Sequence, residues 1–203
     1  MKSRLFLFAL VIILGLGAAV WAQEKEKAAP AMDPQMQAMM AAMEKFGTPG
    51  PEHKGFAETV GTWDVESKMW MDPAAPPHVS KGVSTFRTIL GGRYLQYDYE
   101  GKAMDMTFSG YGISGYDRYN KKYVSLWLDS MSTGFYLTEG TCDAAGKVCT
   151  ETGVWDDYTT GQKSKVKDVT THYGKDKFTM EMYMVLPDGK EIKTMELTYT
   201  RRK

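Results

Sequence analysis

From Gly61 to the end of the chain, apolar and polar residues alternate with a period of two, and this pattern constrains the fold more than any other feature. The segment TWDVESKM (62–69) alternates in this way, and so does KFTMEMYM (177–184). Because successive side chains of a β-strand point to opposite faces of a sheet, such alternation predicts strands with one buried face. Eight further strand candidates cover residues 78–90, 93–100, 104–115, 122–131, 134–142, 147–155, 163–173 and 190–201.

Short turn-forming segments separate the strand candidates, for example GGR, DAAG and PDGK. About ten strands joined by loops of hairpin length, without helices between them, predict an all-β, antiparallel up-and-down sheet. Closure of such a sheet into a barrel removes its unpaired edges. The polar phase carries charged residues such as Glu66 and Lys167, which predicts a water-facing exterior instead of the apolar exterior of a membrane barrel.

Residues 1–22 have the three regions of a secretory signal peptide. Lys2 and Arg4 form a basic start, an apolar run follows from Leu5 to Val20, and small residues end the segment at Ala22. The charged segment QEKEK follows, where a permanent membrane anchor, the alternative interpretation, would have a basic flank. We therefore expect an exported protein of the bacterial periplasm or the extracellular space, with no membrane span after cleavage.

Residues 23–50 form a charged, Met-rich leader with one predicted helix, ahead of a barrel domain at 51–203. Asp33 is a candidate N-cap, Pro34 stands at the first helical position, and Gly47 follows the helix. Methionines recur at i, i+3, i+4 and i+7 on one face of this helix, at Met36, Met39, Met40 and Met43. We expect this face to pack on the rim of the barrel. Docking of a protein partner and binding of Cu(I), which soft thioethers suit, are the alternatives.

The charge balance excludes a nucleic-acid-binding surface of the usual kind. Loss of residues 1–22 leaves 23 basic and 25 acidic residues of both signs mixed along the chain. Such a chain has no basic patch or stripe to follow a phosphate backbone. The remaining length of roughly 180 residues is that of a single domain with a sizeable core.

The two cysteines of the chain lie close together, in the segment GTCDAAGKVCTETG. If Ala145 and Gly146 form the turn of a hairpin, Cys142 faces Cys149 directly across the two strands. An exported chain folds in an oxidising compartment, so we expect a disulfide that staples the hairpin, without a redox role. Two packed, reduced thiols are the alternative.

A short helix-forming stretch, FAETV, leads into GTW (61–63) at the start of the first strand. A helix, a Gly-x-Trp segment and an up-and-down barrel together resemble lipocalins and their calycin relatives. In that group the tryptophan packs across the barrel floor, and an arginine of the last strand lies over the indole. Arg201 shares the apolar phase of the last strand, so the resemblance implies a floor formed by Trp63 and Arg201. An ordinary core tryptophan with a solvated terminal arginine is the alternative.

A longer resemblance covers about residues 52–202. The segments that carry it are GTWDVESKMWMDP, ILGGRYLQYDYEG, FSGYGISGYDRYNKKYVSLWLDSMSTG, TGVWDD and DGKEIKTMELTYTR. They are similar to the bacterial family called domain of unknown function 1579. This resemblance implies a lipocalin-like barrel without an established activity, and it does not extend to the Met-rich leader or the two cysteines.

A small barrel lined by Met, Trp and Tyr can hold a small apolar or amphipathic molecule. Candidate residues for such a pocket are Arg93, Tyr97, Trp127, Met180, Met182, Met184 and Tyr199. Arg93 follows a Gly-Gly turn, where its guanidinium can pair with a ligand carboxylate or with neighbouring loop carbonyls.

His172 lies on a strand candidate, in the segment DVTTHYG. In ten-stranded, nitrobindin-like calycins a histidine binds haem iron, so this resemblance makes His172 a candidate axial ligand. A structural histidine near a strand end is the alternative. No group of His, Cys, Asp and Glu has the spacing of a Zn²⁺ site, so the sequence predicts no metal site and no resident cofactor.

Three functions follow from these features, and none includes a predicted catalytic residue. The first is an exported barrel that binds a small apolar or amphipathic molecule. The second is a small-barrel enzyme, such as an isomerase or cyclase acting on a bound lipid. It would need an interior ionisable group with a displaced pKa, for which Arg93, His172 and Glu181 are the candidates. The third is an envelope protein with a filled core that docks a partner through its Met-rich helix.

Overall fold

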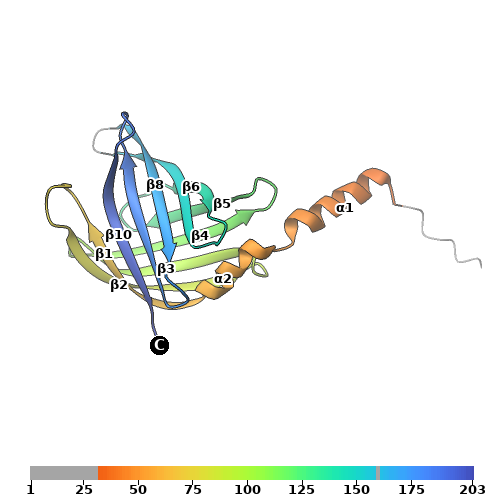
Figure 1. Cartoon of the computed structure of the whole chain (residues 1–203), viewed down its shortest axis with the longest axis horizontal. Helices are drawn as coiled ribbons and strands as arrows, with labels where there is room; N and C mark the ends of the chain where they lie inside the picture. The colour runs from red at the N-terminus through yellow and green to blue at the C-terminus, as the bar shows by residue number, and fades with distance from the viewer. Residues whose placement is uncertain (1–31, 159–160) are drawn as a thin grey trace, which may run out of the picture.

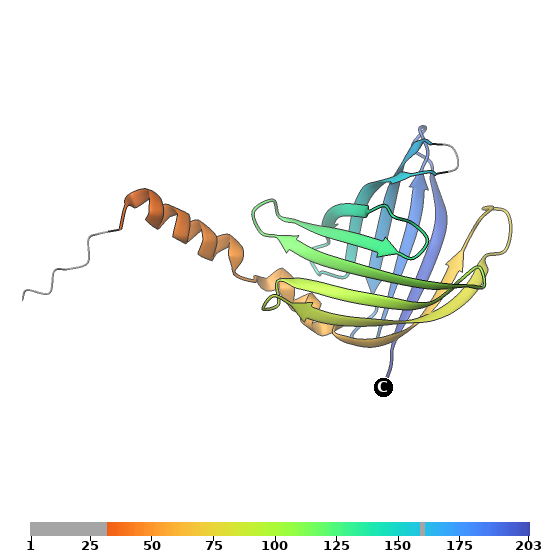
Figure 2. The ribbon, with the colours of Figure 1, turned by 180° about the vertical axis from the view of Figure 1, so that it is seen from behind.

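The computed structural model describes residues 32–158 and 161–203. Within them, ten antiparallel strands close into one barrel, in which sequence neighbours pair and β1 pairs with β10 (Figure 1, Figure 2). The strands are β1 (Gly61–Met69), β2 (His78–Ile89), β3 (Tyr94–Ala103), β4 (Met106–Asp117), β5 (Lys122–Asp129), β6 (Tyr136–Cys142), β7 (Val148–Asp156), β8 (Lys163–His172), β9 (Lys177–Val185) and β10 (Glu191–Arg201). The predicted up-and-down barrel is confirmed. The predicted signal peptide, residues 1–22, lies outside the described residues.

Three helical segments precede β1: α1 (Pro34–Gly47), the 3-10 helix η1 (Pro51–His53) and α2 (Lys54–Thr59). Asp33 caps α1 by accepting a hydrogen bond of 2.7 Å from the backbone N–H of Gln35, as its position before Pro34 favours. The helix α1 projects away from the barrel (Figure 1). None of its residues, all of which the structure describes, is buried, so the expected packing of its Met face on the rim does not occur.

The short helix α2 packs against the barrel, chiefly against β2 and β3. Its Phe56 is 6% exposed and meets Tyr123 of β5 at 6.1 Å between ring centroids. Phe56 belongs to the same buried cluster as Trp63, Phe86 and Phe178. The barrel core is therefore continuous with the helix that precedes β1.

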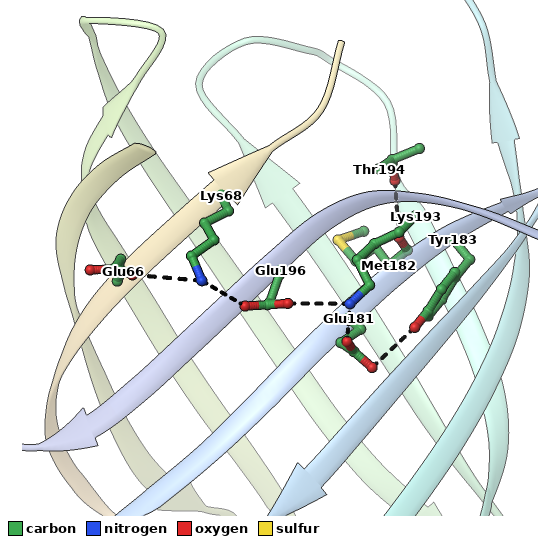
Figure 3. A network of polar contacts seen from close by, with 8 residues as sticks. All are labelled: Glu66, Lys68, Glu181, Met182, Tyr183, Lys193, Thr194 and Glu196. Carbon is green, nitrogen blue, oxygen red and sulfur yellow. Dashed lines mark hydrogen bonds and ion pairs between the residues drawn. The ribbon is translucent and has the colours of Figure 1, made fainter. Parts of the chain in front are cut away.

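The outer face of β1, β10 and β9 carries a network of alternating charges (Figure 3). Lys68 bonds Glu196 at 3.0 Å, and Lys193 bonds both Glu196 and Glu181. Tyr183 donates a hydrogen bond of 3.0 Å to Glu181. Glu181 was a candidate for an interior ionisable group, and that prediction is wrong. The carboxylate faces outward because Glu181 alternates with the inward-facing Met180 and Met182.

Cys142 of β6 and Cys149 of β7 are paired across the hairpin and joined by a disulfide. The backbone N–H of Asp143 donates to the carbonyl of Val148 at 2.8 Å, which closes the turn between them. The predicted staple is therefore present.

Replacing both cysteines with serine is expected to lower the free energy of unfolding by about 2–3 kcal/mol, because a short closed loop no longer restricts the unfolded chain. Urea denaturation followed by tryptophan fluorescence measures the effect. Wild-type protein kept in a reductant is the control and should unfold at the midpoint of the variant. An unchanged midpoint in both samples would show that the staple carries no stability.

Candidate functional site

One end of the barrel is closed by Trp63 and Arg201, which the β1–β10 register places directly opposite each other. The guanidinium carbon of Arg201 lies 4.2 Å from the ring centroid of Trp63, and Trp63 is 2% exposed. Arg201 also donates to the carbonyl oxygens of Glu58 at 2.5 Å and Val60 at 2.6 Å. The arginine thus links the last strand to the segment that enters the first.

Gly61 is required at this closed end for two reasons. Its φ of +134° is a conformation that residues with a Cβ rarely adopt. A Cβ at this position would also lie 2.8 Å from Nη1 of Arg201. The glycine of the Gly-x-Trp segment therefore makes room for the arginine that covers the tryptophan.

A stack of aromatic rings lines the wall formed by β2 to β5. Tyr97 lies 5.2 Å from Phe86 and 5.9 Å from Trp127, in nearly parallel planes. Two glycines of β4 leave the space for these rings. A Cβ on Gly112 would lie 2.1 Å from the ring of Tyr97, and a Cβ on Gly110 would lie equally close to the ring of Trp127. This wall is therefore filled and rigid.

The wall opposite β4 in the ring of strands is β9, whose interior face carries Met180, Met182 and Met184. They are half-buried and pair in register with Thr170, Asp168 and Val166 of β8, respectively. Thioether side chains are flexible and adapt to irregular apolar surfaces. The interior thus has one aromatic wall and one adaptable wall.

A row of hydrogen-bonded polar side chains crosses the interior from β4 to β7. The hydroxyls of Ser114 and Ser125 lie 2.8 Å apart, and Ser125 also donates to Glu151 at 3.2 Å. Thr138 donates to the other oxygen of Glu151 at 2.6 Å. Tyr97 bonds to Ser114, and burial raises the pKa of Tyr97 to about 12. Glu151 therefore ends a connected chain of hydroxyl groups.

Asp168 of β8 stands next to Glu151 in the β7–β8 register and is 4% exposed. The hydroxyl of Tyr136 lies 3.0 Å from each of its carboxyl oxygens and donates to them. Burial raises the pKa of Asp168 to about 7, and the charge of Glu151 acts in the same direction, while the hydrogen bond from Tyr136 opposes both. This carboxyl group therefore changes its charge near neutral pH.

The contact between Tyr136 and Asp168 spans three strands. In register, Thr138 of β6 pairs with Gly153 of β7, which pairs with Val166 of β8. Tyr136 precedes Thr138 by two residues and Asp168 follows Val166 by two residues, so the two lie on opposite sides of this row. The line that joins them passes over Gly153. Glycine presents no side chain at this position, and a Cβ there would lie 2.3 Å from the carbonyl oxygen of Leu137.

A small pocket of about 30 Å³ lies at the end of the barrel opposite Trp63, lined among others by Trp127, Asp129, Tyr136, Trp155 and Tyr158. Tyr136 is both part of this lining and the partner of Asp168. The pocket holds only one or two water molecules, whereas ligand sites usually measure about 300 Å³ or more. A larger molecule must displace side chains at this end to reach Asp168.

The predicted pocket residues take different places in this arrangement. Tyr97 and Trp127 form the aromatic wall, and the three methionines form the adaptable wall. Tyr199 is stacked on Phe178 at 4.2 Å, within the packed layer near Trp63. Arg93 is exposed and donates to the carbonyl oxygens of Gly47 at 2.7 Å and Leu90 at 3.0 Å. The prediction that Arg93 lines the pocket is therefore wrong. Its guanidinium bonds to neighbouring carbonyl groups, as the alternative interpretation expected.

His172 lies at the end of β8, with its ring 5.4 Å from that of Phe178. Burial lowers the pKa of His172, which favours the neutral imidazole. Across residues 32–158 and 161–203, no group of three His, Cys, Asp or Glu side chains is arranged to hold a metal ion. The described segments also contain no helix long and apolar enough for a membrane span.

Sequence reasoning missed the interior carboxyl groups, although the sequence holds a signal for one of them. In SKVKDVTTH, Asp168 shares the phase of Val166 and Thr170, opposite to Lys165 and Lys167. An acidic residue in the apolar phase of a strand therefore indicates a buried carboxyl group. Tyr136, its partner, lies 32 residues away and carries no such signal.

The fold and the interior side chains together define the class of this protein. It is a closed ten-stranded β-barrel with an ionisable group among its interior side chains. The chain belongs to the family of proteins of unknown function DUF1579, whose model matches residues 48–201. No curated protein matches the sequence.

Solved structures are similar to this chain to different degrees. The crystal structure of Rv2717c from M. tuberculosis is 14% identical with a TM-score of 0.55, covering 77% of this chain and 100% of that one. A redesigned β-barrel, mFAP0, bound to DFHBI, is 16% identical with a TM-score of 0.39, covering 71% of this chain and 99% of that one. At 14% identity, the first of these likenesses shows a shared fold.

Proposed function

We propose that the barrel interior binds a small amphipathic molecule in an exported protein. The observation that carries this proposal is the position of Asp168, which is buried beside Met182 and hydrogen-bonded to Tyr136 at the pocket. A barrel interior that served only as a core would gain stability from an apolar residue in this place. A polar group held on an adaptable apolar wall instead suits a ligand that has both a polar end and an apolar body.

The arrangement assigns a role to each wall. The hydroxyl row and the two carboxyl groups accept hydrogen bonds from the polar end of the ligand, so that end carries a donor such as a hydroxyl or amine. The methionines of β9 adjust to the apolar body. The exposed side chains of the pocket, Phe135 and Tyr158, move apart on entry, since the pocket is too small for a ligand in the observed state.

The fluorescent aromatic amine 1-aminoanthracene tests this function, because it combines an apolar body with a hydrogen-bond donor. We expect saturable binding with a rise of probe fluorescence and quenching of tryptophan emission. Met182→Trp fills the interior and should weaken binding at least about tenfold, or ~1.4 kcal/mol. Val79→Trp is the matched control, since Val79 is on the same barrel but 58% exposed and lies outside the pocket lining. Equal affinity in both variants, or no saturable binding to the wild type, would reject an interior site.

A second candidate function, acid–base catalysis on a bound lipid, is favoured by the pKa of about 7 at Asp168. The group can give or take a proton at neutral pH, as an isomerase or cyclase requires. In that case Asp168→Asn abolishes turnover of a substrate and keeps the binding of 1-aminoanthracene. If the variant retains turnover, Asp168 is no acid or base in the reaction.

A further inference from the structure

The methionine face of α1 has no contact with the core of the protein. Met36, Met39, Met40 and Met43 are 46%, 45%, 51% and 63% exposed. An amphipathic helix normally buries its apolar side chains on a neighbouring element. Here the helix projects from the barrel in both views (Figure 1, Figure 2). Packing on the barrel therefore does not explain why these residues are methionines.

We propose that α1 binds Cu(I) through the thioether sulfurs of Met36, Met39, Met40 and Met43, a function separate from ligand binding in the barrel. Residues three and four positions apart on a helix are neighbours, with Cβ atoms about 5–6 Å apart. Methionine has three rotatable side-chain bonds, so two or three sulfurs of this face can converge on one ion. Soft thioether ligands select Cu(I) among the biologically common metal ions.

The composition of the segment points to sulfur and not to hydrophobicity alone. Residues 34–43 read PQMQAMMAAM, in which every long aliphatic side chain is methionine and none is leucine, isoleucine or valine. A face selected only for apolar contact could use any of these residues. The same ten positions hold no His, Cys, Asp or Glu, the ligands that Zn²⁺ and harder ions require. The donor set therefore suits Cu(I) and discriminates against divalent ions.

The C-terminal end of α1 is fixed to the barrel. Arg118 donates to the carbonyl oxygens of Lys45 at 2.5 Å and Thr48 at 2.8 Å, and Arg93 donates to that of Gly47. The ring of Phe46 meets that of Tyr119 at 5.2 Å. These contacts hold the last turn of α1, so its four thioethers stay accessible to solvent and apart from the barrel interior.

The experiment is an anaerobic calorimetric titration of the purified protein with Cu(I) kept in solution by acetonitrile. We expect uptake of about one ion per chain and shifted methyl resonances for the methionines of α1 in ¹³C NMR. The variant in which Met36, Met39, Met40 and Met43 are all replaced by leucine should lose this uptake. Leucine and methionine have similar helix propensity, so far-UV circular dichroism should not change.

A matched control replaces four other exposed methionines with leucine: Met71, Met104, Met106 and Met131. This control should bind Cu(I) like the wild type. The proposal is wrong if the wild type takes up no Cu(I). It is also wrong if both leucine variants lose uptake equally, since binding would then be adventitious. Both results leave the interior ligand site unaffected, because 1-aminoanthracene binding does not involve α1.

Discussion

Replacing Trp63 with alanine lowers the free energy of unfolding by about 3–5 kcal/mol, a large share of the total for a domain of this size. The indole is 2% exposed and lies 4.9 Å from the ring of Phe178 and 6.3 Å from that of Phe86. Its removal leaves a cavity and takes away the surface under Arg201. The arginine would keep its carbonyl contacts but lose the ring over which its charge lies.

Urea denaturation followed by circular dichroism measures this loss as a lower transition midpoint. Phe135→Ala is the matched control, because Phe135 is also aromatic but 70% exposed. We expect it to change the stability by less than about 0.5 kcal/mol. Similar midpoints for the Trp63 and Phe135 variants would mean that Trp63 does not close the barrel.

Replacing Asp168 with asparagine makes the protein more stable at pH 8 and removes a pH dependence between about pH 4 and 7. The pKa of Asp168 rises from 3.8 to about 7 in the folded state, so the folded protein binds this proton more tightly than the unfolded chain. The protonated carboxyl group of Asp168 contributes its full stability when the pH is below the pKa of this residue in the unfolded chain. This contribution is lost as the pH rises through the pKa of Asp168 in the folded protein. The loss amounts to at most about 4 kcal/mol. Asparagine stays neutral and can still accept the hydrogen bond from Tyr136.

The comparison between variant and wild type isolates Asp168 from its neighbours. Glu151 faces it from β7, Tyr136 from β6 and Met182 from β9, and all three remain in the variant. Asp156→Asn is the control, since Asp156 is exposed and pairs with Lys163 on the surface. Denaturation midpoints at several pH values should diverge from the wild type only for Asp168→Asn. Parallel profiles for all three proteins would contradict a buried, shifted carboxyl group.

A stabilising substitution at Asp168 would have a functional meaning. Chains commonly keep residues that lower stability where they serve binding or catalysis. If Asp168→Asn also weakens the binding of 1-aminoanthracene, the carboxyl group is part of the ligand site. The stability measurement and the binding measurement therefore test two separate properties of the same residue.

The sequence by itself determined the features that depend on neighbouring residues. Period-two alternation and turn residues define the ten strands, and the spacing of Cys142 and Cys149 defines their hairpin bridge. Asp33 and Pro34 define the start of α1. Each of these rests on contacts within one strand, one turn or one helix end, where the local chain geometry leaves few choices.

The tertiary structure alone decided which interior side chains meet. Alternation shows that Asp168 faces inward, but the stagger between β6 and β8 brings it to Tyr136 across Gly153. The direction of Arg93 likewise depends on where Gly47 lies after α1, and the free Met face of α1 depends on where that helix projects. These contacts join residues far apart in the chain, and strand tilt and closure, which no local pattern encodes, determine their distances.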